Sequence, residues 1–188
     1  MVLIDSKGGS LLLYHPKWSK SKKRLMSFIC DSLHSRVDFK VINYRKAHDQ
    51  LGRTVITVDK VEMLNMCTIT AEREEYYRER DIRIQLDDFS YDNILNNRAI
   101  QEQAQEQLKM EGIYAQFDFF SALEEYFNSP IEISLKSNDM LIKILCILDR
   151  RVGKRTLRKM KESISEEKTL VQDFYKLRCD AENIHSSE

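Results

Sequence analysis

The stretch that decides the fold is VDFKVINYRKAHDQLGRTVITVDKVEMLNMCTIT, residues 37–70. Its first part alternates apolar and polar side chains, the period of two that turns one face of a strand toward a core and the other toward water. Residues 54–58 are β-branched throughout, which suits a pleated, half-buried surface. A third apolar run begins at Val61. We therefore predict a three-stranded antiparallel meander over about residues 37–69.

The connections between these strands agree with a meander. Asp59 and Lys60 leave room for a two-residue hairpin between the second and third strands. In the longer connection before the second strand, Gly52 is available for a positive φ. A meander buries one face only, so helices must cover that face. The predicted fold class is α+β, with one helix before the sheet and a mainly helical C-terminal part of five or six helices.

The domain organisation that we expect is a single domain over residues 17–161 between two flanking segments. Residues 1–16 contain Gly8, Gly9 and Pro16, which predict an extension that is either disordered or adds a short edge strand. Residues 70–111 are strongly charged and then Gln-rich, which predicts a protruding arm of two helices that ends at Gly112. Residues 113–128 predict the central core helix, lying across the sheet. Residues 162–188 predict a helical acidic tail.

Cysteine usage and hydropathy bear on the compartment. The four cysteines are far apart and none belongs to a CxxC pair, so the sequence supports neither a zinc ribbon nor a redox motif. Scattered cysteines without an export signal are typical of a reducing cytoplasm. No apolar run approaches the roughly 18 residues that a membrane span needs, and the N-terminus lacks the pattern of a signal peptide. We expect a cytoplasmic protein that does not enter the membrane.

The charges are balanced in sum, with 30 basic and 30 acidic residues, but they are segregated along the chain. Residues 17–53 carry a net charge of +7 and residues 137–161 carry +6, whereas residues 54–136 carry −9. One interpretation is that these blocks neutralise each other inside the fold. The other is that the basic blocks form a surface that meets phosphates.

The function that we favour from the sequence is a non-enzymatic binding module that uses both basic blocks to contact nucleic acid or a ribonucleoprotein. The first block offers candidate ligands on the first helix and on the loop after the first strand, where binding groups commonly lie: Lys20, Lys22, Lys23, Arg45, Lys46, His48 and Arg53. The second block offers a denser cluster: Arg150, Arg151, Lys154, Arg155 and Arg158.

Two alternatives stay open. The first is a protein-interaction or inhibitor role of the immunity type, in which the charged arm contacts a partner. The second is a metal-dependent nuclease that uses Asp31, Asp38, Lys40 or His48. No GxGxxG, HExxH or zinc-ligand spacing occurs, and GKRT (153–156) lacks the spacing of a phosphate loop. We therefore assign no catalytic residues and expect neither a metal nor a cofactor.

Four short segments carry a family resemblance: WSK (18–20), FICDSL (28–33), YRKAHDQ (44–50) and LDRRVGKR (148–155). Together they resemble a family of short, uncharacterised bacterial proteins over roughly residues 17–161. The resemblance implies a bacterial origin and a cytoplasmic location. It implies no particular activity.

Overall fold

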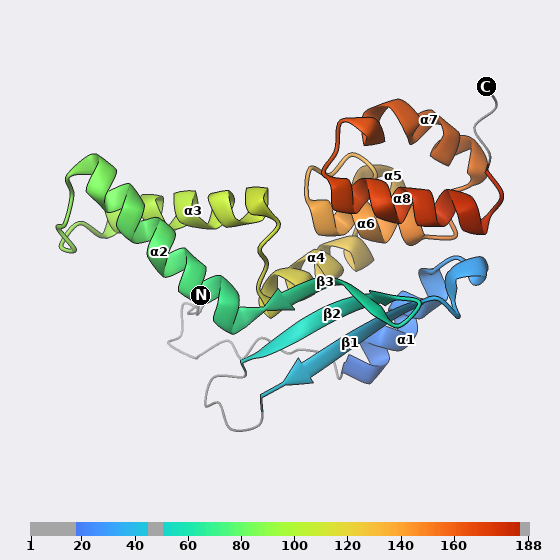
Figure 1. The fold of residues 1–188 in the computed structure, drawn as a ribbon, viewed down its shortest axis with the longest axis horizontal. Helices are drawn as coiled ribbons and strands as arrows, with labels where there is room; N and C mark the ends of the chain where they lie inside the picture. The colour runs from blue at the N-terminus through green and yellow to red at the C-terminus, as the bar shows by residue number, and fades with distance from the viewer. Residues whose placement is uncertain (1–17, 45–50, 185–188) are drawn as a thin grey trace.

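The computed structural model describes residues 18–44 and 51–184. Its sheet has three antiparallel strands in the order β1-β2-β3, formed by Val37–Asn43, Gly52–Val58 and Val61–Cys67 (Figure 1). The hairpin between β2 and β3 has two residues at its turn, Asp59 and Lys60, with φ of +50° and +71°. Such a turn follows the right-handed twist of the strands. The predicted α+β fold with a three-stranded meander is confirmed.

One face of the sheet is packed against aromatic side chains of two helices. Phe39 lies opposite Ile56 in the register, and both are buried. The ring of Phe39 stacks on Phe119 of α4 (Gln116–Asn128) at 6.2 Å between centroids. Trp18 of α1 (Trp18–Phe28) meets Phe119 edge to face at 6.1 Å. The helix across the sheet is therefore α4, as predicted, although it begins at residue 116 rather than 113.

Seven helices follow the sheet in the described chain, compared with the five or six expected. The additional one is α5 (Ile131–Ser134), a single turn. The centre of the C-terminal part is α6 (Met140–Leu148), in which every residue except Lys143 is buried. Its first turn is capped by Asp139, whose carboxylate accepts from the backbone N–H groups of Leu141 and Ile142 at 2.7 and 3.1 Å. Helix α7 (Lys154–Ser165) packs against α8 (Thr169–Ala181), which in turn packs against α6.

The segment predicted as an acidic tail contributes to the core. Helix α8 (Thr169–Ala181) packs against α6 and buries Val171 and Phe174 completely. The hydrophobic core of the domain therefore includes residues beyond 161. Residues 1–16, expected as an extension, lie outside the described residues. None of the described helices is long and apolar enough to cross a membrane.

The predicted arm consists of α2 (Thr68–Leu86) and α3 (Ile94–Glu111), which run antiparallel and project from the body of the protein (Figure 1). The two helices share a small core of their own, formed by Ile82, Ile100 and Ala104. Near the base, Arg78 pairs with Glu111 at 2.7 Å. Gly112 ends α3 with φ of +82°, a conformation that favours glycine.

Candidate functional site

Two of the segments that carry the family resemblance meet at one place, which we call the motif junction and define as residues 28–30 and 148–151. Ile29 and Asp149 form an isolated antiparallel bridge. The N–H of Cys30 donates to the carbonyl of Leu148 at 2.9 Å, and the N–H of Arg150 donates to the carbonyl of Phe28 at 2.7 Å. The end of α1 is thereby joined to the end of α6, although more than one hundred residues separate them in sequence.

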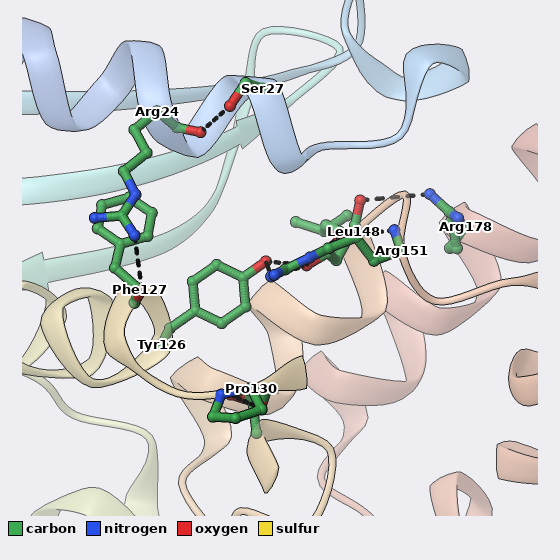
Figure 2. Close-up of polar contacts among 10 residues, drawn as sticks. Arg24, Ser27, Tyr126, Phe127, Pro130, Leu148, Arg151 and Arg178 are labelled. Atoms are coloured by element: carbon green, nitrogen blue, oxygen red, sulfur yellow. Dashed lines mark hydrogen bonds and ion pairs between the residues drawn. The ribbon is translucent and has the colours of Figure 1, made fainter. Parts of the chain in front are cut away.

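A buried carboxylate holds the motif junction together. The Asp149 side chain is completely buried and accepts a hydrogen bond from the Tyr126 hydroxyl of α4 (Figure 2). It also accepts from Arg151, whose Nη2 and Nε lie 2.6 and 2.9 Å from Oδ2, and from the Arg151 backbone N–H at 2.7 Å. This bidentate ion pair compensates the negative charge of Asp149, which would be costly to bury alone.

Aromatic rings complete the junction. The Arg151 guanidinium lies 4.2 Å from the centroid of the Phe28 ring. Arg24 of α1 lies 4.2 Å from the Phe127 ring and donates from Nη2 to the Phe127 carbonyl at 2.7 Å (Figure 2). Cations over ring faces add to the stability of such contacts. Both arginines therefore attach α1 and α6 to the end of α4.

A second buried cation lies beside the junction. Arg178 of α8 is 1% exposed and donates to the carbonyls of Leu148 and Val152 at 3.4 and 3.1 Å. Its Nη2 lies 3.3 Å from Glu182, which also accepts from the Cys30 thiol at 3.1 Å. The pKa of Arg178 is lowered, chiefly by desolvation. Attraction to Glu182 and Cys179 opposes this shift in part. These bonds attach α8 to the same point as the other helices.

The protonation states argue against acid–base chemistry at the junction. Burial raises the pKa of the Tyr126 hydroxyl, and the hydrogen bond to Asp149 raises it further. Burial also raises the pKa of the Cys146 thiol to about 12. Both groups therefore keep their protons near neutral pH, whereas a general base or nucleophile needs a pKa near the working pH. We interpret the motif junction as a structural anchor.

Four of the seven predicted ligands of the first basic block lie within the described residues, and two of them are in ion pairs. Lys22 pairs with Asp38 at 2.5 Å, and Arg53 pairs with Glu62 at 3.3 Å on the sheet. Lys20 and Lys23 are exposed on α1. Arg45, Lys46 and His48 lie outside the described residues.

The second basic block divides into an anchored part and a free part. Arg151 is bound to Asp149, Arg150 lies 4.0 Å from Asp31, and Lys154 donates to the Glu182 carbonyl at 2.8 Å. The free part is the outer face of α7, on which four exposed cations make no ion pair within the described chain; we call it the basic α7 face. Its members are Arg155, Arg158, Lys159 and Lys161. In Figure 1 it lies across the body from α1.

The far end of the arm is apolar and acidic. Residues 84–95, which we call the arm tip, expose six large apolar side chains by 56% to 81%: Ile84, Leu86, Phe89, Tyr91, Ile94 and Leu95. Three aspartates, Asp87, Asp88 and Asp92, lie among them, and residues 84–95 themselves include no Lys or Arg. Arg83, 4% exposed, orders the turn by packing 4.4 Å from the Tyr91 ring and donating to Asn97 at 2.7 Å.

Of the residues named for a nuclease, the structure describes Asp31, Asp38 and Lys40, whereas His48 lies outside the described residues. Asp31 is exposed in a short 3₁₀ turn (Asp31–Leu33), and Asp38 is paired with Lys22 on β1. Within residues 18–44 and 51–184, no three His, Cys, Asp or Glu side chains gather as metal ligands would.

A cavity of about 270 Å³ lies between the arm base and the C-terminal helices, lined partly by Tyr114 and Met140.

Comparison with known proteins gives one finding. A family model described as the SF0329 protein family matches residues 17–179. The chain belongs to the SF0329 protein family. No curated protein and no solved structure matches it. The SF0329 match reaches into α8, beyond the end of the resemblance at residue 161, and so includes the helix that completes the core.

Sequence reasoning missed four residues of interest in this SF0329 family member. Tyr126 and Arg178 contact the motif junction, and Lys159 and Lys161 belong to the basic α7 face. One signal for Arg178 exists in the sequence, because it follows Val171 and Phe174 at the spacing of one helical face. A cation on an apolar face predicts a buried, paired charge. For Tyr126, only the fold reveals the partner.

Proposed function

We propose that this SF0329 family member is a non-enzymatic binding protein that contacts the phosphate backbone of nucleic acid, free or within a ribonucleoprotein, through the basic α7 face. The observation that carries the proposal is the set of four exposed cations on one helix, without ion-pair partners in the described chain. Leu157 and Ile164 on the inner side of α7 are buried, which anchors the helix and leaves its outer face to project the cations into solvent.

The chemistry of such a face favours phosphate over other ligands. Lys and Arg contact phosphates without reading sequence, and each contact releases counterions. Four contacts would weaken binding to duplex DNA by about 150-fold between 50 and 200 mM salt, because log K falls with a slope of about −0.9 per contact. Little sequence preference is expected, since contacts to phosphate carry no sequence information.

The proposal includes the cellular compartment in which the protein acts. We place the protein in the bacterial cytoplasm, where nucleic acid and ribonucleoproteins are accessible. All four cysteines are free thiols, which is the usual state in a reducing compartment.

The experiment is a titration of the purified protein against short single- and double-stranded RNA and DNA at low and moderate salt. We expect binding that weakens at least tenfold with salt and is much weaker in the variant Arg155→Glu/Arg158→Glu. A matched control is Lys20→Glu/Lys23→Glu, which removes the same charge from α1. Absence of binding at low salt would end the proposal.

A second candidate function is protein interaction through the arm, and the arm tip favours it. Exposed apolar patches of this kind mark interaction sites, and the three aspartates suit a partner whose apolar groove is rimmed by Lys or Arg. The test compares proteins retained by the native chain and by Phe89→Ser/Leu95→Ser, followed by reconstitution of any differing complex from purified components. The same capture by both chains would reject the arm tip.

A further inference from the structure

The cavity of about 270 Å³ at the arm base lies where four segments of the chain meet. These are the end of α3, the connection from α3 to α4, the start of α6, and the residues just before α8. The starts of α6 and α8 lie on the side of the body that faces the arm (Figure 1). A ligand in the cavity would therefore contact both the arm and the C-terminal helices.

The volume of the cavity suits a small metabolite. A water molecule takes up about 30 Å³ in the liquid, so the cavity is larger than a packing gap that one or two waters fill. Pockets that enclose drug-sized ligands measure about 300–1,000 Å³, so a nucleotide or a peptide is too large to be enclosed. A free amino acid has a suitable size.

One part of the lining is apolar. Tyr114 and Met140 are 3% and 6% exposed, and Met110, at the end of α3, is 67% exposed. The Tyr114 hydroxyl donates to the Lys109 carbonyl at 3.3 Å, which orients the ring. Methionine side chains are flexible and adapt to the shape of an apolar group. This part of the lining can cover an apolar side chain of a ligand.

The lining also contains two lysines, Lys109 and Lys168. The Lys168 ammonium donates to the Lys109 carbonyl at 2.6 Å, and the Lys109 ammonium lies 3.6 Å from Asp118. An ammonium can donate several hydrogen bonds, so both lysines are positioned by the protein and retain donors for a ligand.

Two carboxylates, Asp139 and Glu167, face the same cavity. Asp139 accepts from two backbone N–H groups of α6 through Oδ1, and Glu167 pairs with Lys143. A carboxylate can accept further hydrogen bonds at its remaining lone pairs. Burial raises the pKa of the Tyr114 hydroxyl, and the charge of Asp139 raises it further. The cavity thus offers acceptors as well as donors, all held in place before a ligand enters.

We propose that this cavity binds a free α-amino acid with an apolar side chain. The two lysines bind its carboxylate, the two acidic residues bind its ammonium group, and Tyr114 and Met140 cover its side chain. This inference does not rest on the proposed phosphate-binding role of α7.

The balance of charge in the lining selects a zwitterion over other small ligands. An anion attracted by the lysines would also lie close to Asp139 and Glu167, and such like charges repel. A cation would meet the lysines with the same disadvantage. A neutral apolar molecule would displace water from four charged groups without replacing its hydrogen bonds. An amino acid supplies both charges and an apolar part.

The first measurement is isothermal titration of the full chain with leucine, methionine and phenylalanine, each compared with the amine that lacks the carboxylate and the acid that lacks the amino group. For leucine these are 3-methylbutylamine and 4-methylpentanoate. We expect a dissociation constant of about 1 mM or lower for at least one of the amino acids, and binding at least tenfold weaker for both of its truncated relatives. Equal binding of a truncated relative, or no binding of any of the three amino acids up to about 10 mM, would overturn the proposal.

The second measurement locates the site with variants of the lining. Lys168→Gln removes a ligand of the carboxylate, and Met110→Trp fills the cavity from an exposed position, so each should raise the dissociation constant at least tenfold. The control is Lys176→Gln, which removes an exposed lysine of α8 that does not line the cavity. Thermal unfolding without ligand shows whether each variant is folded. Unchanged affinity in the folded lining variants, or an equal loss in the control, would overturn the proposal.

Discussion

Replacing Asp149 by alanine should destabilise the fold more than any change at the surface. The substitution removes the acceptor of the buried Tyr126 hydroxyl, and an unsatisfied buried donor costs about 1–3 kcal/mol. It also removes the charge-assisted hydrogen bonds between Asp149 and Arg151. The Arg151 side chain is 36% exposed, so water replaces part of the interaction that it loses. We expect a decrease of about 3–4 kcal/mol in the free energy of unfolding, within the range for breaking a buried ion pair.

The assay is equilibrium unfolding in urea, followed by circular dichroism and by the fluorescence of Trp18, the single tryptophan. For a chain of this size, the same loss lowers the melting temperature by about 6–16 °C. Tyr126→Phe keeps the Arg151 pair and should cost only about 1–2 kcal/mol. Tyr76→Phe, on an exposed side chain, is the matched control and should change nothing.

The reasoning would be refuted by a loss below about 1 kcal/mol for Asp149→Ala with an unchanged dependence on urea, since such a value is ordinary for surface positions. A double-mutant cycle between Asp149 and Tyr126 adds a second check. If the hydroxyl and the carboxylate act together, the two changes must not be additive.

Three further predictions concern other parts of the fold. Gly52→Ala should lower the free energy of unfolding in urea by about 1–3 kcal/mol, because the new Cβ would lie 2.5 Å from the Ile42 carbonyl oxygen. The control is Gly153→Ala, which should be near neutral because no atom lies within 4 Å of its Cβ position. Phe174→Ala should cost about 3–5 kcal/mol, as in any core, and a loss near zero would show that α8 is a detachable tail. The pKa of Tyr126 is raised and that of Tyr175 is raised to about 12, chiefly by burial, so the unfolded chain loses these protons first, near its ordinary pKa of about 10. Stability should therefore be fully present below pH 10 and fall as the pH rises toward 12, and the fall should be shallower in Tyr126→Phe.

Local patterns in the sequence were sufficient for the sheet and for most helices. Alternation and β-branching predicted the strands, and Asp59-Lys60 predicted the hairpin, because these depend on neighbouring residues alone. Gly52 was considered available for a positive φ. The structure gives another reason for glycine there, which is the close approach of Ile42 and Gln116. That contact comes from packing between distant segments, which local patterns do not contain.

The candidate site was harder to predict because charge in sequence does not show whether a cation is paired. Arg151 and Arg155 look alike in LDRRVGKR, yet Arg151 is held by Asp149 and Arg155 is free on α7. The acidic composition of residues 162–188 likewise suggested a tail, whereas the apolar face of α8 places Val171 in the core. Burial, which only the fold reveals, separates these cases.

The most direct test of the account is the salt dependence of binding to a short duplex, measured for the native chain, Arg155→Glu/Arg158→Glu and Lys20→Glu/Lys23→Glu. If the four cations of the basic α7 face contact phosphates, log K should fall with log salt at a slope of about −3.6 in the native chain and at about half that or less in the α7 variant. The α1 variant should keep the native slope. An unchanged slope in the α7 variant, or the larger loss in the α1 variant, would contradict the account.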